Sequence, residues 1–238
     1  FTHVYDAHTG EDLLPKVREM VKEKGFLPQD AEQRDQSWLD TYGMVQTIMA
    51  DFPEFLPNTY DQYYLYPDYK VSHLDPNFTR ADEVMAGREK RVFTECAEVI
   101  KEGKLGDKFH AISDAHAEMM IKVAEAIAYN KNDRHILIVE NNGAIANMQD
   151  DAMVEVVCEL GINGPRPMRV GNIPQFNLGL LVNQVSCEKL IVDAYFENSY
   201  QKALEAFTLN RLINDAKKAR KVLDALIEAN KGMWPELR

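Results

Sequence analysis

The chain has 238 residues, 45% hydrophobic content and a net charge of −11 at neutral pH. This length suits one large domain or two small ones, and the composition is that of a globular protein. The acidic balance, without a basic cluster, argues against a broad nucleic-acid surface. No apolar segment approaches the roughly 18 residues that a membrane span needs. We therefore expect neither nucleic acid nor a membrane as a partner.

Residues 1–6 predict a strand that runs into a turn at Thr9-Gly10. The chain opens on Phe1 instead of a methionine, and we expect it to be part of a longer protein. Capping residues and apolar periodicity then indicate a series of helices in the first half. Helices are predicted over residues 12–24, 29–49, about 80–101 and 114–129.

Five of the ten tyrosines fall within residues 58–69. Tyr60, Tyr63 and Tyr64 have the spacing that places three phenols on one side of a helical turn, which Pro67 should end. One interpretation is a packing stripe whose hydroxyls reach water or a carbonyl. The other is a phenol that faces a cleft and transfers a proton. Composition leaves both open.

The second half predicts a small sheet followed by helices. Residues 135–139 and 153–160 have the pattern of strands, and 168–171 that of a further short one, while Pro165 and Pro167 should break the second strand. From Pro174 to Asn230 the chain should be mostly helical, with a separate helix over about 214–229. We therefore expect a helix-dominated α+β fold, one domain over residues 1–238 without an internal linker.

The three cysteines and six histidines lack the spacing of a metal site. No CxxC, HExxH or Cys/His cluster is present, so we assign no metal ligand to this chain. An odd number of cysteines suits a reducing cytoplasm, where thiols serve as small core residues. The cysteines are Cys96, Cys158 and Cys187.

Six stretches of the chain resemble glycoside hydrolase family 4, the NAD- and metal-dependent glycosidases, and within it the members that open 6-phospho-α-glucosides. A tyrosine cluster alone would be a weak signal, but the six stretches follow one another in the family's order over nearly the whole chain. They are residues 10–15, 56–65, 79–89, 126–130, 138–147 and 229–237.

The resemblance implies the fold and the cofactors. Family members begin with a Rossmann-type domain that carries a glycine-rich NAD turn and metal-binding Cys and His residues, and no GxGxxG turn of that kind occurs in this sequence. We therefore expect the C-terminal domain of the lactate/malate-dehydrogenase-like glycosidases, with the N-terminal Rossmann domain absent. NAD and Mn²⁺, or another divalent metal, would be bound mainly by residues outside this chain.

By this resemblance, Tyr60 matches the family's proton acceptor. In the family's scheme, NAD takes a hydride from C3 of the sugar, and the metal-held ketone makes the C2 proton acidic. A base removes that proton and the glycosidic bond breaks by elimination. Because a free phenol has a pKa of about 10, only about one in a thousand is ionised at neutral pH. Nearby positive charge is therefore an expected part of the mechanism. Tyr63 and Tyr64 are expected in the cleft wall or core.

Arg80 matches the family's substrate-contacting arginine. A planar guanidinium can bind a phosphate or sugar hydroxyls with two parallel donors, which lysine cannot do. The alternative is an arginine at a helix start that pairs with Asp82 or Glu83.

Asn141, Asn142 and Asn147 follow the predicted strand at 135–139. Loops at the ends of buried strands commonly bind ligands. These amides would then donate to the sugar or the cofactor, or alternatively cap the backbone of the turn.

The function implied is the C-terminal part of a 6-phospho-α-glucosidase that works by oxidation, elimination, addition and reduction, inactive by itself. Its expected partners are a 6-phosphoglucoside, the missing NAD-binding domain and further copies in a homodimer or tetramer. Two alternatives stay open. One is a non-catalytic module for assembly or sugar-phosphate binding, and the other is a family member of different sugar or anomeric specificity.

Overall fold

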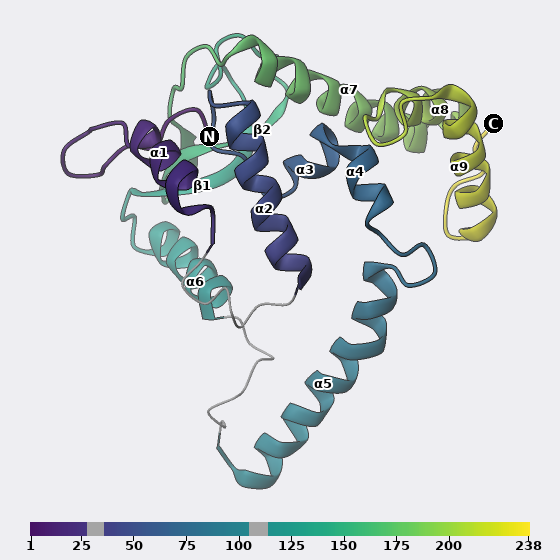
Figure 1. Cartoon of the computed structure of the whole chain (residues 1–238), viewed down its shortest axis with the longest axis horizontal. Helices are drawn as coiled ribbons and strands as arrows, with labels where there is room; N and C mark the ends of the chain where they lie inside the picture. Colours follow the sequence, from purple (N-terminus) through teal and green to yellow (C-terminus); the bar gives the residue numbers. More distant parts are fainter. Residues whose placement is uncertain (28–35, 105–113) are drawn as a thin grey trace. The chain divides into compact units, whose positions relative to one another are not determined.

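The computed structural model describes residues 1–27, 36–104 and 114–238 (Figure 1). The chain divides into two compact units: Phe1–Leu74 with Lys189–Arg238, and Asp75–Glu188. Within the described residues, no helix is both long enough and apolar enough to cross a bilayer.

The first unit is built from helices. Val21 of α1 packs against Val45 and Met49 of α2 in one core cluster. α1 starts with a proline in its first turn and stops at Gly25, whose φ of 73° favours glycine. These helices confirm the sequence predictions, although residues 29–35 of the second predicted helix lie outside the described part of the chain. The helices are α1 (Leu14–Lys24), α2 (Gln36–Asp51), α3 (Asp61–Leu65), α4 (Pro67–Ser72), α8 (Tyr200–Leu209) and α9 (Ala216–Ala229).

A second core cluster of this unit joins α8 and α9 to the end of α7 (Gln175–Glu197), through Ala194, Ala203 and Leu223. The predicted helical run is interrupted after α7, because Ser199 caps α8 by accepting from the Lys202 N–H. Asp215 caps α9 in the same way. The separate last helix predicted from the sequence is therefore confirmed.

The predicted strand over residues 1–6 is wrong. Among the described residues this stretch forms one β-bridge, between Tyr5 and Asp12, and no strand. Asp6 instead holds the turn, because its carboxylate accepts hydrogen bonds from the N–H groups of His8 and Thr9. The turn itself was predicted correctly. Val4 and Asp6 bond to the backbone of the same loop, and Phe1 exchanges two backbone hydrogen bonds with Leu56, but no sheet forms here.

The second unit contains a three-stranded antiparallel sheet in the order β1-β2-β3. Its strands are β1 (Asp133–Glu140), β2 (Met153–Gly161) and β3 (Gly164–Pro167). β2 alternates between buried and exposed side chains, so Val154, Val156 and Cys158 face a core cluster. Val185 of α7 belongs to the same cluster. The helix-dominated α+β class with a small sheet is confirmed.

The second strand ends at Gly161, before Pro165 and Pro167, as predicted, but these prolines do not end the sheet. They lie in β3, where they pair with Leu160 and Cys158 of β2. β3 is an edge strand, so a missing N–H on its outer side removes no ladder bond. The strand predicted over 168–171 is also wrong, since in that stretch only Gly171 forms a bridge, with Ile145.

Two further helices belong to this unit. α6 (Asp114–Ala128) packs against β2 (Figure 1). α5 (Arg80–Glu102) begins with a capping box, in which Thr79 accepts from the Asp82 N–H and the Asp82 carboxylate accepts from the Thr79 N–H. α5 ends at Gly103, whose φ is 69°. None of its residues is buried.

Candidate functional site

Tyr60 lies directly before α3 in a turn that two side chains fix. The Asn58 side-chain oxygen accepts from the Tyr60 N–H at 2.9 Å, and the Asn58 N–H donates to the Asp61 carboxylate at 2.8 Å. Burial raises the pKa of the Asp61 carboxyl, against the opposing effect of this bond from Asn58. The reciprocal Asn–Asp arrangement determines the direction in which the Tyr60 backbone enters the helix.

Tyr60 is 68% exposed as a whole residue. The centroid of its ring lies 6.2 Å from that of Tyr63, with 30° between the planes. The Lys70 ammonium lies 5.4 Å from the centroid of the Tyr63 ring, at the distance of a cation–π contact. Lys70 as a whole residue is only 9% exposed. A phenol open to solvent is thus supported by a second aromatic ring and a lysine.

Two further hydrogen bonds hold the turn in place. Gln62 is buried, and its side-chain amide donates to the Thr59 carbonyl at 2.7 Å. The Tyr64 carbonyl accepts from the Arg211 guanidinium at 3.2 Å, a bond that ties α3 to the segment between α8 and α9. Tyr60 is therefore an exposed side chain on a turn whose backbone is held in place by hydrogen bonds.

Pro67 lies at the boundary between two helices. α3 ends at Leu65, as the proline suggested, but Pro67 then begins α4. Tyr66 forms the junction between the two helices, with φ −131° and ψ 53°. Because the helix is interrupted there, simple periodicity gave no reason to place Lys70 on the face of Tyr63, and the sequence analysis missed this residue.

Tyr66 gives a pH-dependent prediction. Its hydroxyl donates to the Asp51 carboxylate, and burial, together with this bond, raises the pKa of Tyr66 to about 12. A phenol whose pKa rises on folding contributes stability that is fully present below its ordinary pKa near 10 and lost as the pH approaches 12. The melting temperature of the wild type should exceed that of Tyr66→Phe at pH 8, and the difference should shrink between pH 10 and pH 12. An undiminished difference at pH 12 would contradict this assignment.

Arg80 is the first residue of α5 and belongs to the second unit, whereas Tyr60 belongs to the first. Its guanidinium pairs with Glu83, so the helix-start alternative is realised in this structure. The Arg80 side chain remains 64% exposed. An exposed ion pair of this kind contributes little free energy, so a phosphate could replace the Glu83 carboxylate at small cost.

Asn141 takes the second of its two expected roles, as a cap of the loop. It is fully buried, and its amide nitrogen donates to the carbonyls of Ile145, Met148 and Gln149 at 3.0 to 3.2 Å. Its side-chain oxygen accepts from the Ile145 N–H at 2.7 Å. With donors and acceptor occupied, no group is left for a ligand.

The other two asparagines differ from each other. The Asn147 side-chain amide donates to the Ile173 carbonyl at 2.9 Å, and its side-chain oxygen accepts from the Ile173 N–H at 3.0 Å. Asn147 therefore also holds the loop in place. Asn142 is exposed, has a left-handed φ of 43°, and makes one long contact of 3.3 Å with Glu140. Of the three, Asn142 has the side chain that a ligand could reach.

The described residues contain no group of three or more His, Cys, Asp or Glu side chains that could bind a metal ion. Cys158 and Cys187 are buried, and burial raises the pKa of both thiols, which opposes the thiolate form that a metal requires. His3 bonds to Asp12 at 2.8 Å. These residues do not fit a self-contained metal site.

Comparison with known proteins gives the class of the chain. Residues 1–213 match the family 4 glycosyl hydrolase C-terminal domain. The chain therefore belongs to glycosyl hydrolase family 4 and corresponds to its C-terminal domain.

Individual relatives are similar over nearly the whole chain. Maltose-6′-phosphate glucosidase MalH of Clostridium acetobutylicum is 48% identical over 231 residues, which are 96% of this chain and 52% of the relative. Maltose-6′-phosphate glucosidase of Bacillus subtilis is 48% identical over 229 residues, 96% of this chain and 51% of that protein. The chain thus spans about half the length of the curated relatives it matches.

Solved structures agree with this placement. The crystal structure of a 6-phospho-α-glucosidase from gut microorganisms in complex with NAD and Mn²⁺ is 81% identical, with a TM-score of 0.92, over 100% of this chain and 54% of that one. A second such enzyme, in complex with NAD and glucose-6-phosphate, is 44% identical with a TM-score of 0.90 over the same shares.

Proposed function

We propose that this chain is the C-terminal, substrate-binding part of an NAD- and divalent-metal-dependent 6-phospho-α-glucosidase. The observation that carries the proposal is the 81% identity, over the whole chain, with the 6-phospho-α-glucosidase solved with NAD and Mn²⁺. The glucose-6-phosphate bound to the second enzyme supports a phosphorylated sugar as substrate. The curated relatives are glucosidases of the same kind.

In this proposal Tyr60 accepts the C2 proton of the sugar at its phenolic oxygen. When bound, NAD and the metal together supply the oxidation at C3 that makes the C2 proton acidic. Tyr60 contributes an exposed ring on an anchored turn, so its oxygen can approach a bound sugar. The Tyr63 ring lies beside the Tyr60 ring, and the Lys70 ammonium lies over Tyr63.

Arg80 is proposed to bind the sugar phosphate. Its guanidinium is largely exposed at the start of α5, and its ion pair with Glu83 is a weak surface pair. A dianionic phosphate offers a stronger, bidentate partner than one carboxylate. Asn142 is the remaining loop amide that can donate to the ligand.

NAD and the metal are proposed to bind mainly to residues outside this chain, because the residues described here do not form a metal site. The isolated chain should then be inactive. It would supply the base and the phosphate contact to a protein whose other half holds the cofactors.

The test compares the isolated chain with the full-length protein on maltose 6′-phosphate and on maltose, each with and without NAD. We expect hydrolysis by the full-length protein alone, dependent on NAD, with kcat/KM at least about 100-fold higher for the phosphorylated sugar. Hydrolysis by the isolated chain, or equal activity on maltose, would contradict the proposal. Self-association of the full-length protein without sugar-phosphate binding would favour the assembly module instead.

A further inference from the structure

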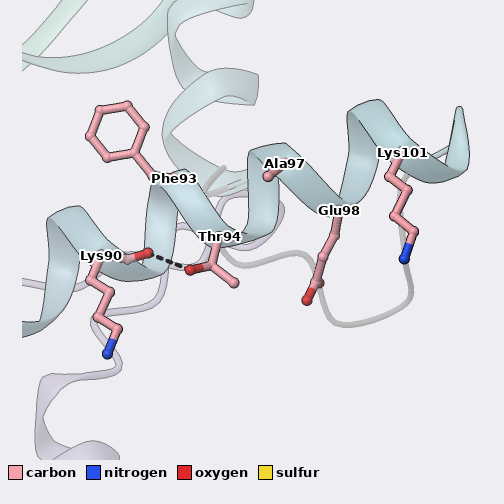
Figure 2. Close-up of a pocket in the computed structure, with 6 residues that line it drawn as sticks. All are labelled: Lys90, Phe93, Thr94, Ala97, Glu98 and Lys101. Atoms are coloured by element: carbon pink, nitrogen blue, oxygen red, sulfur yellow. Dashed lines mark hydrogen bonds between the residues drawn. The ribbon is translucent and has the colours of Figure 1, made fainter.

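Exposed polar groups of the second unit differ in whether hydrogen bonds already hold them. On α5, the Thr94 hydroxyl donates to the Lys90 carbonyl at 2.8 Å, beside the shallow depression that Figure 2 shows. In the loop after β1, by contrast, one peptide group joins Asn142 to Gly143 without such a bond. Neither its carbonyl nor its N–H has a hydrogen-bond partner among the described residues.

Asn142 and Gly143 are the two central residues of a tight turn. The Ala144 N–H donates to the Asn141 carbonyl across the turn at 2.7 Å, and the Asn142 N–H donates to the Asp150 carbonyl at 2.9 Å. Both central residues have a positive φ, 43° and 77°, as a type I′ turn requires. Hydrogen bonds therefore hold the ends of the turn, while the peptide group at its centre is unbonded.

Rotation of this central peptide group converts the turn to type II′. The positive φ of Asn142 and the bond across the turn are kept, while ψ of Asn142 becomes about −120° and φ of Gly143 becomes negative. Glycine adopts either sign of φ, so Gly143 permits the change. An added Cβ at Gly143 would meet nothing within 4 Å, so no neighbouring group obstructs this place. In the rotated turn, the Gly143 nitrogen can reach the side-chain carbonyl carbon of Asn142.

The Asn142 side chain is also free to turn toward that nitrogen. It is exposed, and its amide makes one long contact, 3.3 Å from the Glu140 carboxylate. The neighbouring Asn141 is fully buried, and four hydrogen bonds fix its side chain. Of these two adjacent asparagines, Asn142 is therefore the one placed to react.

We propose that Asn142 is a site of spontaneous deamidation, driven by the nitrogen of Gly143. That nitrogen forms a bond to the side-chain carbonyl carbon of Asn142, the bond from this carbon to the amide nitrogen breaks, and the Gly143 proton leaves with it as ammonia. Water then opens the resulting five-membered ring at either of its two carbonyls, giving aspartate or isoaspartate. Water is the only co-reactant. Asparagine is thermolabile in proteins, and here the turn makes one asparagine more reactive than others.

The chain contains the same dipeptide a second time, at Asn163-Gly164. Gly164 belongs to β3 and pairs with Gly161 at the end of β2. Rotation of the peptide group between Asn163 and Gly164 would disturb this ladder, so it requires local opening of the sheet. The two sites have the same local chemistry, and the fold should make Asn163 the slower one.

Deamidation changes the loop in two ways. Either product places a carboxylate beside Glu140, in place of the amide that now donates to it, and two like charges repel. Isoaspartate also adds a methylene to the backbone of the turn. If Asn142 donates to the ligand, as the proposed function has it, the modified protein should bind a sugar phosphate more weakly. The deamidation itself does not depend on that role.

The first test follows the full-length protein through incubation at mildly alkaline pH, where the attacking nitrogen loses its proton more readily. Mass spectrometry of proteolytic peptides measures conversion at Asn142 and Asn163. In the folded protein, we expect conversion at Asn142 to be at least about tenfold faster than at Asn163, and in denaturant we expect similar rates. Equal rates in the folded protein, no conversion at Asn142, or the same difference in denaturant would overturn the proposal.

The second test examines the products. Because the ring opens at two carbonyls, both aspartate and isoaspartate should appear at position 142, and peptide fragmentation distinguishes them. Aspartate alone would indicate direct hydrolysis of the side chain and would contradict the attack by Gly143.

The third test measures the affinity of the full-length protein for glucose 6-phosphate by calorimetry, before and after incubation. The affinity of the wild type should fall as conversion at Asn142 proceeds, whereas that of Asn142→Gly should stay at its own starting value. Equal losses in both proteins would contradict a change at Asn142 as the cause. Conversion at Asn142 with constant affinity would support the deamidation site and remove Asn142 from ligand binding.

Discussion

Replacing Tyr60 by phenylalanine should lower kcat of the full-length enzyme on a 6-phospho-α-glucoside by roughly 10² to 10⁴-fold, the usual contribution of a proton-transfer group. KM should change little, because the ring and its contact with Tyr63 remain. The cause is the loss of the phenolic oxygen, which leaves the C2 proton without a base. Steady-state kinetics on purified protein measure both quantities.

Tyr63→Phe is the matched control for this effect. It removes a phenol from the same turn and keeps the ring under the Lys70 ammonium. We expect kcat within a few-fold of the wild type, since Tyr63 supports Tyr60 through its ring. Equal losses in the two variants would remove the proton-transfer role from Tyr60 in particular, and full activity of Tyr60→Phe would exclude it.

Replacing Asn141 by alanine should destabilise the protein by about 3 to 5 kcal/mol, an unusually large effect for one residue. The side chain makes four hydrogen bonds to the loop after β1 while fully buried. Its removal leaves a buried N–H and buried carbonyls without partners, each costing about 1 to 3 kcal/mol. The midpoint of denaturant unfolding measures the loss.

Asn142→Gly is the comparison within the same loop. Asn142 is exposed and has φ 43°, a conformation that glycine adopts readily. The change should therefore stay within about 1 kcal/mol of the wild type. If Asn141→Ala were equally mild, the hydrogen bonds of Asn141 would not be what holds the loop.

Most helices could be predicted from the sequence because their signals are local. The Thr79–Asp82 capping box and the glycine after α5 lie within a few residues of the helix they bound. β3 could not be predicted in this way, since its prolines are tolerated only because the strand lies at the edge of the sheet. Residues 1–6 failed for a related reason: a strand needs a continuous partner, and here Tyr5 bridges to Asp12 while Phe1 bonds to the distant Leu56.

At the candidate site, the sequence indicated the residues better than their contacts. The resemblance pointed to Tyr60 and Arg80, and the structure shows both with largely exposed side chains. It could not show that Lys70 lies on Tyr63, because that contact crosses the break between α3 and α4. Asn141 and Asn142 look alike in the sequence, and only burial separates the loop cap from the accessible amide.

The account depends most on removal of the sugar's C2 proton by Tyr60. The most direct measurement is hydrolysis of a 6-phospho-α-glucoside in D₂O by the full-length enzyme, with deuterium at C2 of the released glucose 6-phosphate followed by NMR. We predict that the wild-type product carries deuterium at C2 and that Tyr60→Phe gives no such product at a comparable rate. A wild-type product with only hydrogen at C2, or undiminished labelling by Tyr60→Phe, would contradict the account.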